Sequence, residues 1–493
     1  MFVVACNRSG IQTAQPDSDR TVRYVSPGSE FSDQDYVIGL VNRKLKEDGT
    51  GIVLELTRIP WDAWDQKTNL MFASGEEFDL IHVMQDLKTA TTLYSMNAIQ
   101  SLNKYIDNFP ALKTRVQEHL GEFTVNGQLL AVPVKPTHAQ GRDYGNIFYR
   151  QSIFKKVNGT IPTNVDELIV LGLKMQKAIY DELGVKTYAW THNLNYQPTW
   201  LHQAYPEAPF VVENTLGIVK FNVDGTVESF YESDAFRRDC EVYKRLYDLG
   251  LTHPDILTLD NEFITNEGAY GRFVFGFTTF NYQDEVPLTR NTGDYLGDFN
   301  LKPVMGTIIT SGIFNGNAVP ASCKDPNIPL KFLDWVYTSS DNYRLFTLGE
   351  EGRDYKLVNN DRLELVNGQD GSPKYHFDEW QIVFADYVLF DVNATEKQIE
   401  LARNPIQGTV WRMPTIGFNF ESASVSNEMA NLSNEIITSI YPIKFGLVDY
   451  ASNIDGAIAR LKAAGLEKVL DEYRRQFKAH YESGKAQFGM FER

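Results

Sequence analysis

Apolar and polar positions along the first part of the chain follow a strand, helix, strand order. Residues 21–26 and 51–57 alternate like half-buried strands, and residues 78–83 form a shorter apolar run. Between these segments, residues 32–48 and 61–74 carry apolar side chains at helical spacing. Because strands that alternate with helices form mostly parallel sheets, this pattern predicts an α/β lobe.

A second α/β set follows an apolar strand at 128–133. At its start, Thr163 is expected to cap a helix, with Asp166 reaching back to it. The other expected elements are a strand at 146–150, a hairpin turn at 223–226 and a helix at 234–249.

The chain then returns to the pattern of the first set. Strands at 304–309 and 317–320 lead to a helix at 326–336, and two further helices are expected at 424–440 and 453–478. Two interleaved α/β sets require crossovers, which we expect near 133–136, 296–303 and 349–352. Such crossovers form a hinge between two lobes.

Composition narrows the class of protein. The 493 residues carry a net charge of −17, whereas a nucleic-acid-binding surface would be basic. Of the three cysteines, Cys240 and Cys323 are expected to be buried apolar residues rather than a disulfide. The sequence contains no run of about 18 apolar residues that would predict a membrane span.

Aromatic residues make up 13% of the chain, and many stand beside polar residues. Examples are residues 60–65 (PWDAWD), 190–193 (WTHN), 197–200 (QPTW) and 280–283 (FNYQ). An aromatic ring stacks on the apolar C–H face of a sugar while neighbouring amides and carboxylates bind its hydroxyls. The pattern therefore favours a carbohydrate ligand, although most single rings in a protein of this size serve the core.

Motifs for catalysis and metal binding are missing from the sequence. There is no Gly-x-Ser-x-Gly, His-Glu-x-x-His, P-loop or Gly-x-Gly-x-x-Gly motif, and no two histidines lie four residues apart. We therefore expect no metal, no cofactor and no catalytic residue. Paired carboxylates still leave a glycosidase as the alternative, and the lack of internal repeats argues against a structural adhesin.

The first residues suggest how the protein is attached to a cell. Val3, Val4 and Ala5 precede Cys6 as in a bacterial lipoprotein signal, so we expect Cys6 to carry a lipid and residues 7–20 to form a flexible tether. The apolar segment before Cys6 is short, which suggests that the signal peptide lacks its start.

Five further segments form a recognisable set. They are residues 64–80 (WDQKTNLMFASGEEFDL), 102–106 (LNKYI), 148–156 (FYRQSIFKK), 349–355 (GEEGRDY) and the helical region from Gly417 onwards. Together with the lipoprotein-like start, these segments resemble the family 1 extracellular solute-binding lipoproteins of ABC transporters, in their long Gram-positive form. One departure is Gln151, which stands where an acidic residue is common in this family.

This resemblance implies an α/β, two-lobed clamp of the type II periplasmic-binding-protein class, with an interlobe cleft and extra C-terminal helices. It implies a monomer at the outer face of the cell membrane that captures an oligosaccharide and delivers it to ABC permease subunits. We assign residues 1–20 to the lipid attachment and tether, 21–135 with 300–350 to lobe 1, 136–299 with 351–415 to lobe 2, and 416–493 to a C-terminal helical region packed on the lobes.

Ligand contacts are expected at strand ends and in aromatic-polar loops that border the cleft. We interpret His82 and Trp64 as packing residues. The candidate ligand-binding residues are Glu30, Gln85, Arg142, Tyr149, Trp200, Tyr282, Trp411 and Phe418.

Overall fold

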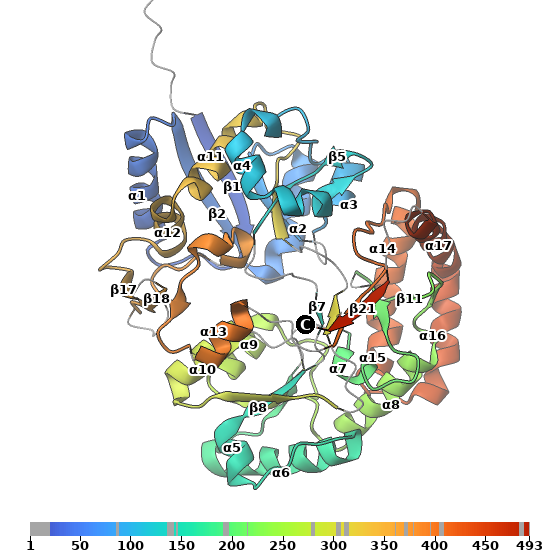
Figure 1. Cartoon of the computed structure of the whole chain (residues 1–493). Coiled ribbons are helices and arrows are strands. Elements are labelled where there is room, and N and C mark those ends of the chain that lie inside the picture. Colours follow the sequence, from blue (N-terminus) through green and yellow to red (C-terminus); the bar gives the residue numbers. More distant parts are fainter. Residues whose placement is uncertain are drawn as a thin grey trace, which may run out of the picture.

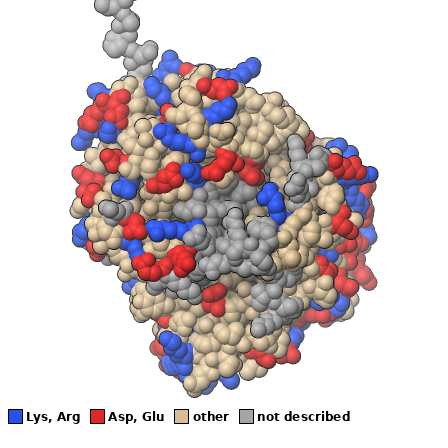
Figure 2. Space-filling view, in the orientation of Figure 1, with Lys and Arg blue, Asp and Glu red and all other residues tan. Residues whose placement is uncertain are grey.

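The computed structural model has two lobes, one above the other in Figure 1, with a bundle of helices beside the lower one. It describes residues 20–84, 88–135, 142–143, 146–190, 197–213, 215–277, 282–301, 307–309, 315–359, 361–368, 373–377, 379–394, 396–403, 409–482 and 488–492. Acidic and basic side chains are interspersed over both lobes on the face shown in Figure 2.

The first lobe is built on a five-stranded sheet in the order β2-β1-β3-β16-β6. β1 pairs in parallel with β2 and β3, as the alternation of strands and helices predicted. β16 is antiparallel to both β3 and β6. The strands are β1 (Arg20–Pro27), β2 (Ile52–Ile59), β3 (Leu80–Met84), β6 (Val132–Pro133) and β16 (Asn315–Ala318).

Helices cover this sheet and bury its apolar side chains in one core. They are α1 (Gln34–Glu47), α2 (Trp61–Ser74), α3 (Ala90–Ser95), α4 (Pro110–Arg115), α11 (Asn327–Thr338) and α12 (Ser340–Leu348). The short elements are η1 (Ile106–Asn108), η2 (Gln117–Phe123), β4 (Thr124–Val125) and β5 (Gln128–Leu129), so the strand expected at 128–133 is divided between β5 and β6.

The second lobe contains a four-stranded sheet in the order β14-β8-β13-β9 and a three-stranded sheet in the order β10-β11-β12. The strands are β8 (Ile147–Arg150), β9 (Tyr188–Trp190), β10 (Phe210–Val212), β11 (Val219–Asn222), β12 (Val227–Ser229), β13 (Phe273–Phe277) and β14 (Leu296–Phe299). The helices are α5 (Gln151–Lys156), α6 (Val165–Leu183), α7 (Thr199–His202), α8 (Asp234–Asp248), α9 (Asn261–Ala269) and α10 (Tyr282–Thr292).

The N-terminus of α6 differs by one residue from the expected capping box. Asn164, not Thr163, is the cap, because its side chain accepts a hydrogen bond from the backbone N–H of Glu167 at 3.0 Å. The Glu167 carboxylate, not Asp166, reaches back and accepts from the backbone N–H of Thr163 at 2.8 Å. The reciprocal motif is therefore present but shifted along the chain.

The C-terminal region shares a core with the second lobe, where Leu432 and Phe477 are buried with Phe221 and Phe236. The helix expected at 453–478 is divided at Gly465, which has a φ of 111°. The elements are η5 (Ala423–Val425), α14 (Ser426–Glu435), a π-helical turn η6 (Ile436–Ile440), α15 (Tyr441–Lys444), α16 (Tyr450–Ala464) and α17 (Leu466–Glu482).

A separate four-stranded sheet, the hinge sheet, lies where the chain passes between the lobes. Its order is β21-β20-β15-β7, and β20 pairs in parallel with β15. The strands are β7 (Arg142–Asp143), β15 (Thr307–Ile309), β20 (Thr409–Arg412) and β21 (Gly489–Glu492). β7 and β15 follow the first two crossovers expected from the sequence.

The third expected crossover, near residues 349–352, is not found at that position. The chain stays on the first lobe there. The hydroxyl of Tyr36 in α1 donates to Glu350 at 2.7 Å, and Arg353 pairs with Asp33. Tyr375 and Phe384 also belong to the core of the first lobe, although we assigned 351–415 to the second.

The segment between α12 and the hinge sheet spans the side of the molecule. Its helix α13 packs on α10 of the second lobe, and Arg290 in α10 pairs with Asp391 in β19 at 3.2 Å. Its elements are β17 (Tyr355–Asn359), β18 (Arg362–Leu365), η3 (Glu379–Gln381), η4 (Ala385–Tyr387), β19 (Phe390–Asp391) and α13 (Glu396–Arg403).

Candidate ligand-binding site

The carboxyl ends of β1, β2 and β3 face the second lobe. Asn315, the first residue of β16, pairs with Met84, the last residue of β3, so the chain enters the first lobe at this edge. The chain leaves the first lobe at the same edge after β6, because β6 also runs antiparallel to β16. In open α/β sheets, ligands bind outside the carboxyl ends of the strands, so this edge, which we call the interlobe edge, is the candidate site.

Three aromatic rings form a column at the interlobe edge. The ring of Trp61, directly after β2, stacks on Trp380 with centroids 5.8 Å apart and an interplanar angle of 23°. His82 in β3 meets Trp380 edge-on at 5.0 Å. His82 is fully buried, Trp380 is half-buried and Trp61 is 43% exposed, so the aromatic column runs from the core to the surface.

Buried hydrogen bonds hold the base of the aromatic column. The amide of Gln381 donates to the carbonyl of Pro27 at 2.9 Å, and the amide of Asn317 donates to the carbonyl of Gln381 at 3.1 Å. The hydroxyl of Tyr24 donates to Asn317 at 2.7 Å. These bonds fix the backbone next to Trp380 and so preorganise its ring.

His82 is a neutral member of this network. Its Nε2 lies 3.1 Å from Oδ1 of Asn315, and burial lowers its pKa to about 4. At neutral pH the imidazole therefore packs as an uncharged ring.

Exposed carboxylates lie at the interlobe edge. Glu30 follows β1, and Asp62 and Asp65 lie on the first turns of α2, all three exposed. Lys88 is buried and pairs with Asp65. Lys135 pairs with Asp386 at 3.0 Å, so both lysines are neutralised by carboxylates.

Among the predicted ligand-binding residues with described side chains, two lie near the junction of the lobes and three pack in the core of the second lobe. Glu30 lies at the interlobe edge, and Trp411 is half-buried in the hinge sheet, stacked on Phe488 at 5.8 Å. The other three described side chains pack in the second-lobe core. Tyr149 is 4% exposed, Trp200 is 2% exposed and stacked on Phe277, and Phe418 packs on Phe477.

Four predicted positions lie outside the description of the structure. Gln85 and Cys6 are not among the described residues, and the side chains of Arg142 and Tyr282 are likewise outside it. His82 and Trp64, which we interpreted as packing residues, are both fully buried, so that interpretation is confirmed.

Trp61 and Trp380 were not among the predicted contacts. A signal for Trp61 was present, because Pro60 and Trp61 directly follow the second parallel strand. No comparable signal marks Trp380, which reaches the interlobe edge through a long-range return of the chain.

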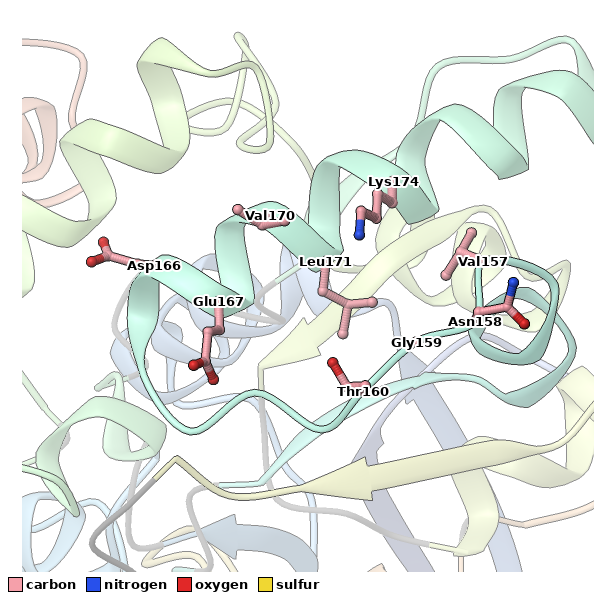
Figure 3. Close-up of a pocket in the computed structure, with 9 residues that line it drawn as sticks. All are labelled: Val157, Asn158, Gly159, Thr160, Asp166, Glu167, Val170, Leu171 and Lys174. Carbon is pink, nitrogen blue, oxygen red and sulfur yellow. The ribbon is translucent and has the colours of Figure 1, made fainter.

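A surface pocket of about 250 Å³ lies away from this edge, on the second lobe. Figure 3 shows it between α6 and the loop that precedes it, with Leu171 and Lys174 on the helix and Thr160 on the loop. Because all its lining residues come from one short stretch of one lobe, it lacks the two-sided contact of a clamp.

Metal-ligating clusters and exposed thiols are missing from the part of the chain that the structure describes. No cluster of three metal-ligating side chains occurs there. Cys240 and Cys323 are free and buried, and burial raises the pKa of both thiols. Among the described helices, none is long and apolar enough to cross a membrane.

Comparison with known proteins identifies the architecture. Residues 414–482 match the family model DUF3502, a domain of unknown function. A carbohydrate ABC transporter substrate-binding protein of Streptococcus pneumoniae is 22% identical over 457 residues, which cover 88% of this chain and 86% of that protein. The N-glycan transport solute binding protein NgtS of S. pneumoniae, solved with Man1GlcNAc, superposes with a TM-score of 0.72 at 19% identity, over 94% of this chain and 99% of NgtS.

The chain has the solute-binding protein fold. The fold class and the family resemblance inferred from the sequence are thereby confirmed. Another S. pneumoniae protein, the ABC transporter substrate-binding protein FusA in complex with kestose, superposes with a TM-score of 0.64 at 14% identity, over 94% of this chain and 100% of FusA. The C-terminal helices belong to the solute-binding fold in this chain, because they complete the core of the second lobe.

Proposed function

We propose that this solute-binding protein is the oligosaccharide-binding component of a carbohydrate ABC importer. The observation that carries the proposal is the two-lobed fold with a three-ring aromatic column at the interlobe edge. Sugars bind such rings through their C–H faces, while neighbouring polar groups bind their hydroxyls.

The relatives support the same ligand class. NgtS and FusA, which share the fold over almost the whole chain, were solved with Man1GlcNAc and kestose. The S. pneumoniae substrate-binding protein that is 22% identical to this chain is named for a carbohydrate ABC transporter. Binding without turnover is the corresponding activity, and the permease subunits of the importer are the corresponding partner.

Calorimetry with a glycan panel tests the proposal. The panel contains mannose–N-acetylglucosamine oligosaccharides, kestose and milk oligosaccharides, and the glycans are recovered and analysed after incubation. We expect saturable binding of at least one glycan, recovered intact. Hydrolysis at enzyme-like rates would establish the glycosidase alternative instead.

The attachment to the cell is a separate part of the proposal. The lipoprotein-like sequence Val3-Val4-Ala5-Cys6 supports a lipid anchor at Cys6, with residues 7–20 as the tether on the outer face of the membrane. Expression of the full-length gene, with a complete signal peptide, in a Gram-positive host with a labelled fatty acid should label the protein but not a Cys6→Ser variant. Equal labelling of both proteins would contradict the anchor without affecting sugar binding.

A further inference from the structure

We propose that the exposed face of Trp61 is a stacking subsite for a neutral pyranose ring, such as a hexose or an N-acetylhexosamine. The inference rests on the proposed function and names the residue and the kind of sugar. Trp380 and His82 are positioning residues, because Trp380 stacks on Trp61 and His82 packs on Trp380.

Exposure separates Trp61 from the other tryptophans. All seven lie in the described part of the chain, and Trp61 alone is exposed, at 43%. Trp64, Trp190, Trp200 and Trp335 are between 0% and 7% exposed. A large apolar ring left in solvent at the edge where ligands bind indicates a contact surface rather than packing.

The ring is also preorganised. Trp61 begins α2, its ring stacks on Trp380, and Trp380 meets the buried His82. The backbone beside Trp380 is fixed by the bonds from Gln381 to Pro27 and from Asn317 to Gln381. A sugar stacking on Trp61 would therefore meet a ring that loses little further freedom on binding.

Charge at the interlobe edge indicates a neutral sugar. Glu30, Asp62 and Asp65 are exposed around the first turn of α2 and the end of β1. Lys88 and Lys135 already pair with Asp65 and Asp386. An anionic sugar would meet the exposed carboxylates of Glu30 and Asp62 on a chain whose overall net charge is −17, so repulsion should weaken its binding.

Variants at Trp61 test the subsite by calorimetry with a neutral glycan that the unaltered protein binds. We expect Trp61→Ala to raise Kd about tenfold or more, and Trp61→Phe, which keeps a smaller ring, to raise it less. Tyr180→Ala is the matched control, because Tyr180 is 54% exposed on α6 of the second lobe. Thermal unfolding of each variant checks that the fold is retained.

A second experiment tests the expected preference for a neutral sugar over an anionic one. The same glycan carrying a sialic or uronic acid should bind more weakly than its neutral form, and the difference should shrink at high salt. Tighter binding of the anionic form would overturn the assignment to a neutral sugar.

The outcomes separate the two proposals. Equal glycan affinity of the unaltered protein and of a folded Trp61→Ala variant would overturn the subsite and leave the proposed function standing. A failure of the unaltered protein to bind every glycan in the panel would contradict the proposed function and remove the subsite with it.

Discussion

Trp61 and Trp64 show how two similar residues acquire different roles within one helical turn. Trp64 shares a buried face of α2 with Thr68 and Met71, at helical spacing. Trp61 lies three residues earlier, so helical phase alone would place it beside Trp64. It stays exposed because the first turn of α2 lies at the interlobe edge, where Trp380 supports it.

The buried His82 makes a testable contribution to pH-dependent stability. Burial and the nearby Arg58 lower its pKa to about 4, whereas the ordinary value in an unfolded chain is 6.5. Between these values the unfolded chain binds a proton that the folded protein does not, so the free energy of unfolding falls as the pH falls. We expect His82 to account for a loss of about 3 kcal/mol between pH 7 and pH 4.

Urea unfolding of a His82→Gln variant at pH 7, 5.5 and 4.5 measures this contribution. The variant should be less stable than the unaltered protein at pH 7, but its stability should fall less steeply on acidification. His119→Gln is the control, because His119 is only partly buried and should change the pH profile less. Parallel profiles for His82→Gln and the unaltered protein would contradict the prediction.

Single elements were predicted well where the pattern is local. Residues 61–74 form α2 with the expected bounds, and the 223–226 turn joins β11 to β12. The cap of α6 was displaced by one residue because Thr163, Asn164, Asp166 and Glu167 all offer capping chemistry. Side-chain geometry selects the pair Asn164 and Glu167.

The break between α16 and α17 gives a prediction at the scale of elements. Gly465 has a φ of 111°, and a Cβ there would lie 2.5 Å from Cγ of Glu428. Gly465→Ala should therefore lower the free energy of unfolding by about 1–3 kcal/mol.

Gly456→Ala is the matched control for this substitution. Gly456 lies inside α16, where the nearest atom to an added Cβ is Nη1 of Arg460 at 3.8 Å. It should raise stability by about 0.5–1 kcal/mol, because alanine is the better helix former. Thermal unfolding compares the two variants, and equal effects in the same direction would contradict the role of backbone conformation.

At the scale of the whole molecule, the sequence predicted the two lobes but not every connection between them. Local periodicity cannot show that Tyr375 and Phe384 return to the first-lobe core, because that contact joins segments far apart in the chain. The position of Trp380 in the candidate site was missed for the same reason. Tyr149 was predicted as a contact from its place after the first crossover, Trp200 from its aromatic-polar loop and Phe418 from its place before the C-terminal helices. None of these sequence features shows whether a ring packs in the core.

The hinge sheet predicts that the lobes rotate as units when a ligand binds both. A glycan that contacts both lobes binds the closed arrangement more tightly and shifts the population towards it. Small-angle scattering should show a smaller radius of gyration with saturating glycan and an unchanged molecular mass. The Trp61→Ala variant at the same glycan concentration should respond less, and an unaltered curve for the native sequence would contradict closure.

The shared core of the C-terminal region also bears on how such proteins diverge. The family match at 414–482 begins and ends within a single packed unit, because Leu432 and Phe477 are buried with Phe221 and Phe236. If residues 414–482 were transferred alone to another protein, the apolar faces of their helices would be exposed to solvent. The second lobe that lost them would expose its own part of the shared core. We therefore expect the region to be inherited together with the second lobe, and substitutions on its buried helical faces to be matched by compensating changes in α8 and β11.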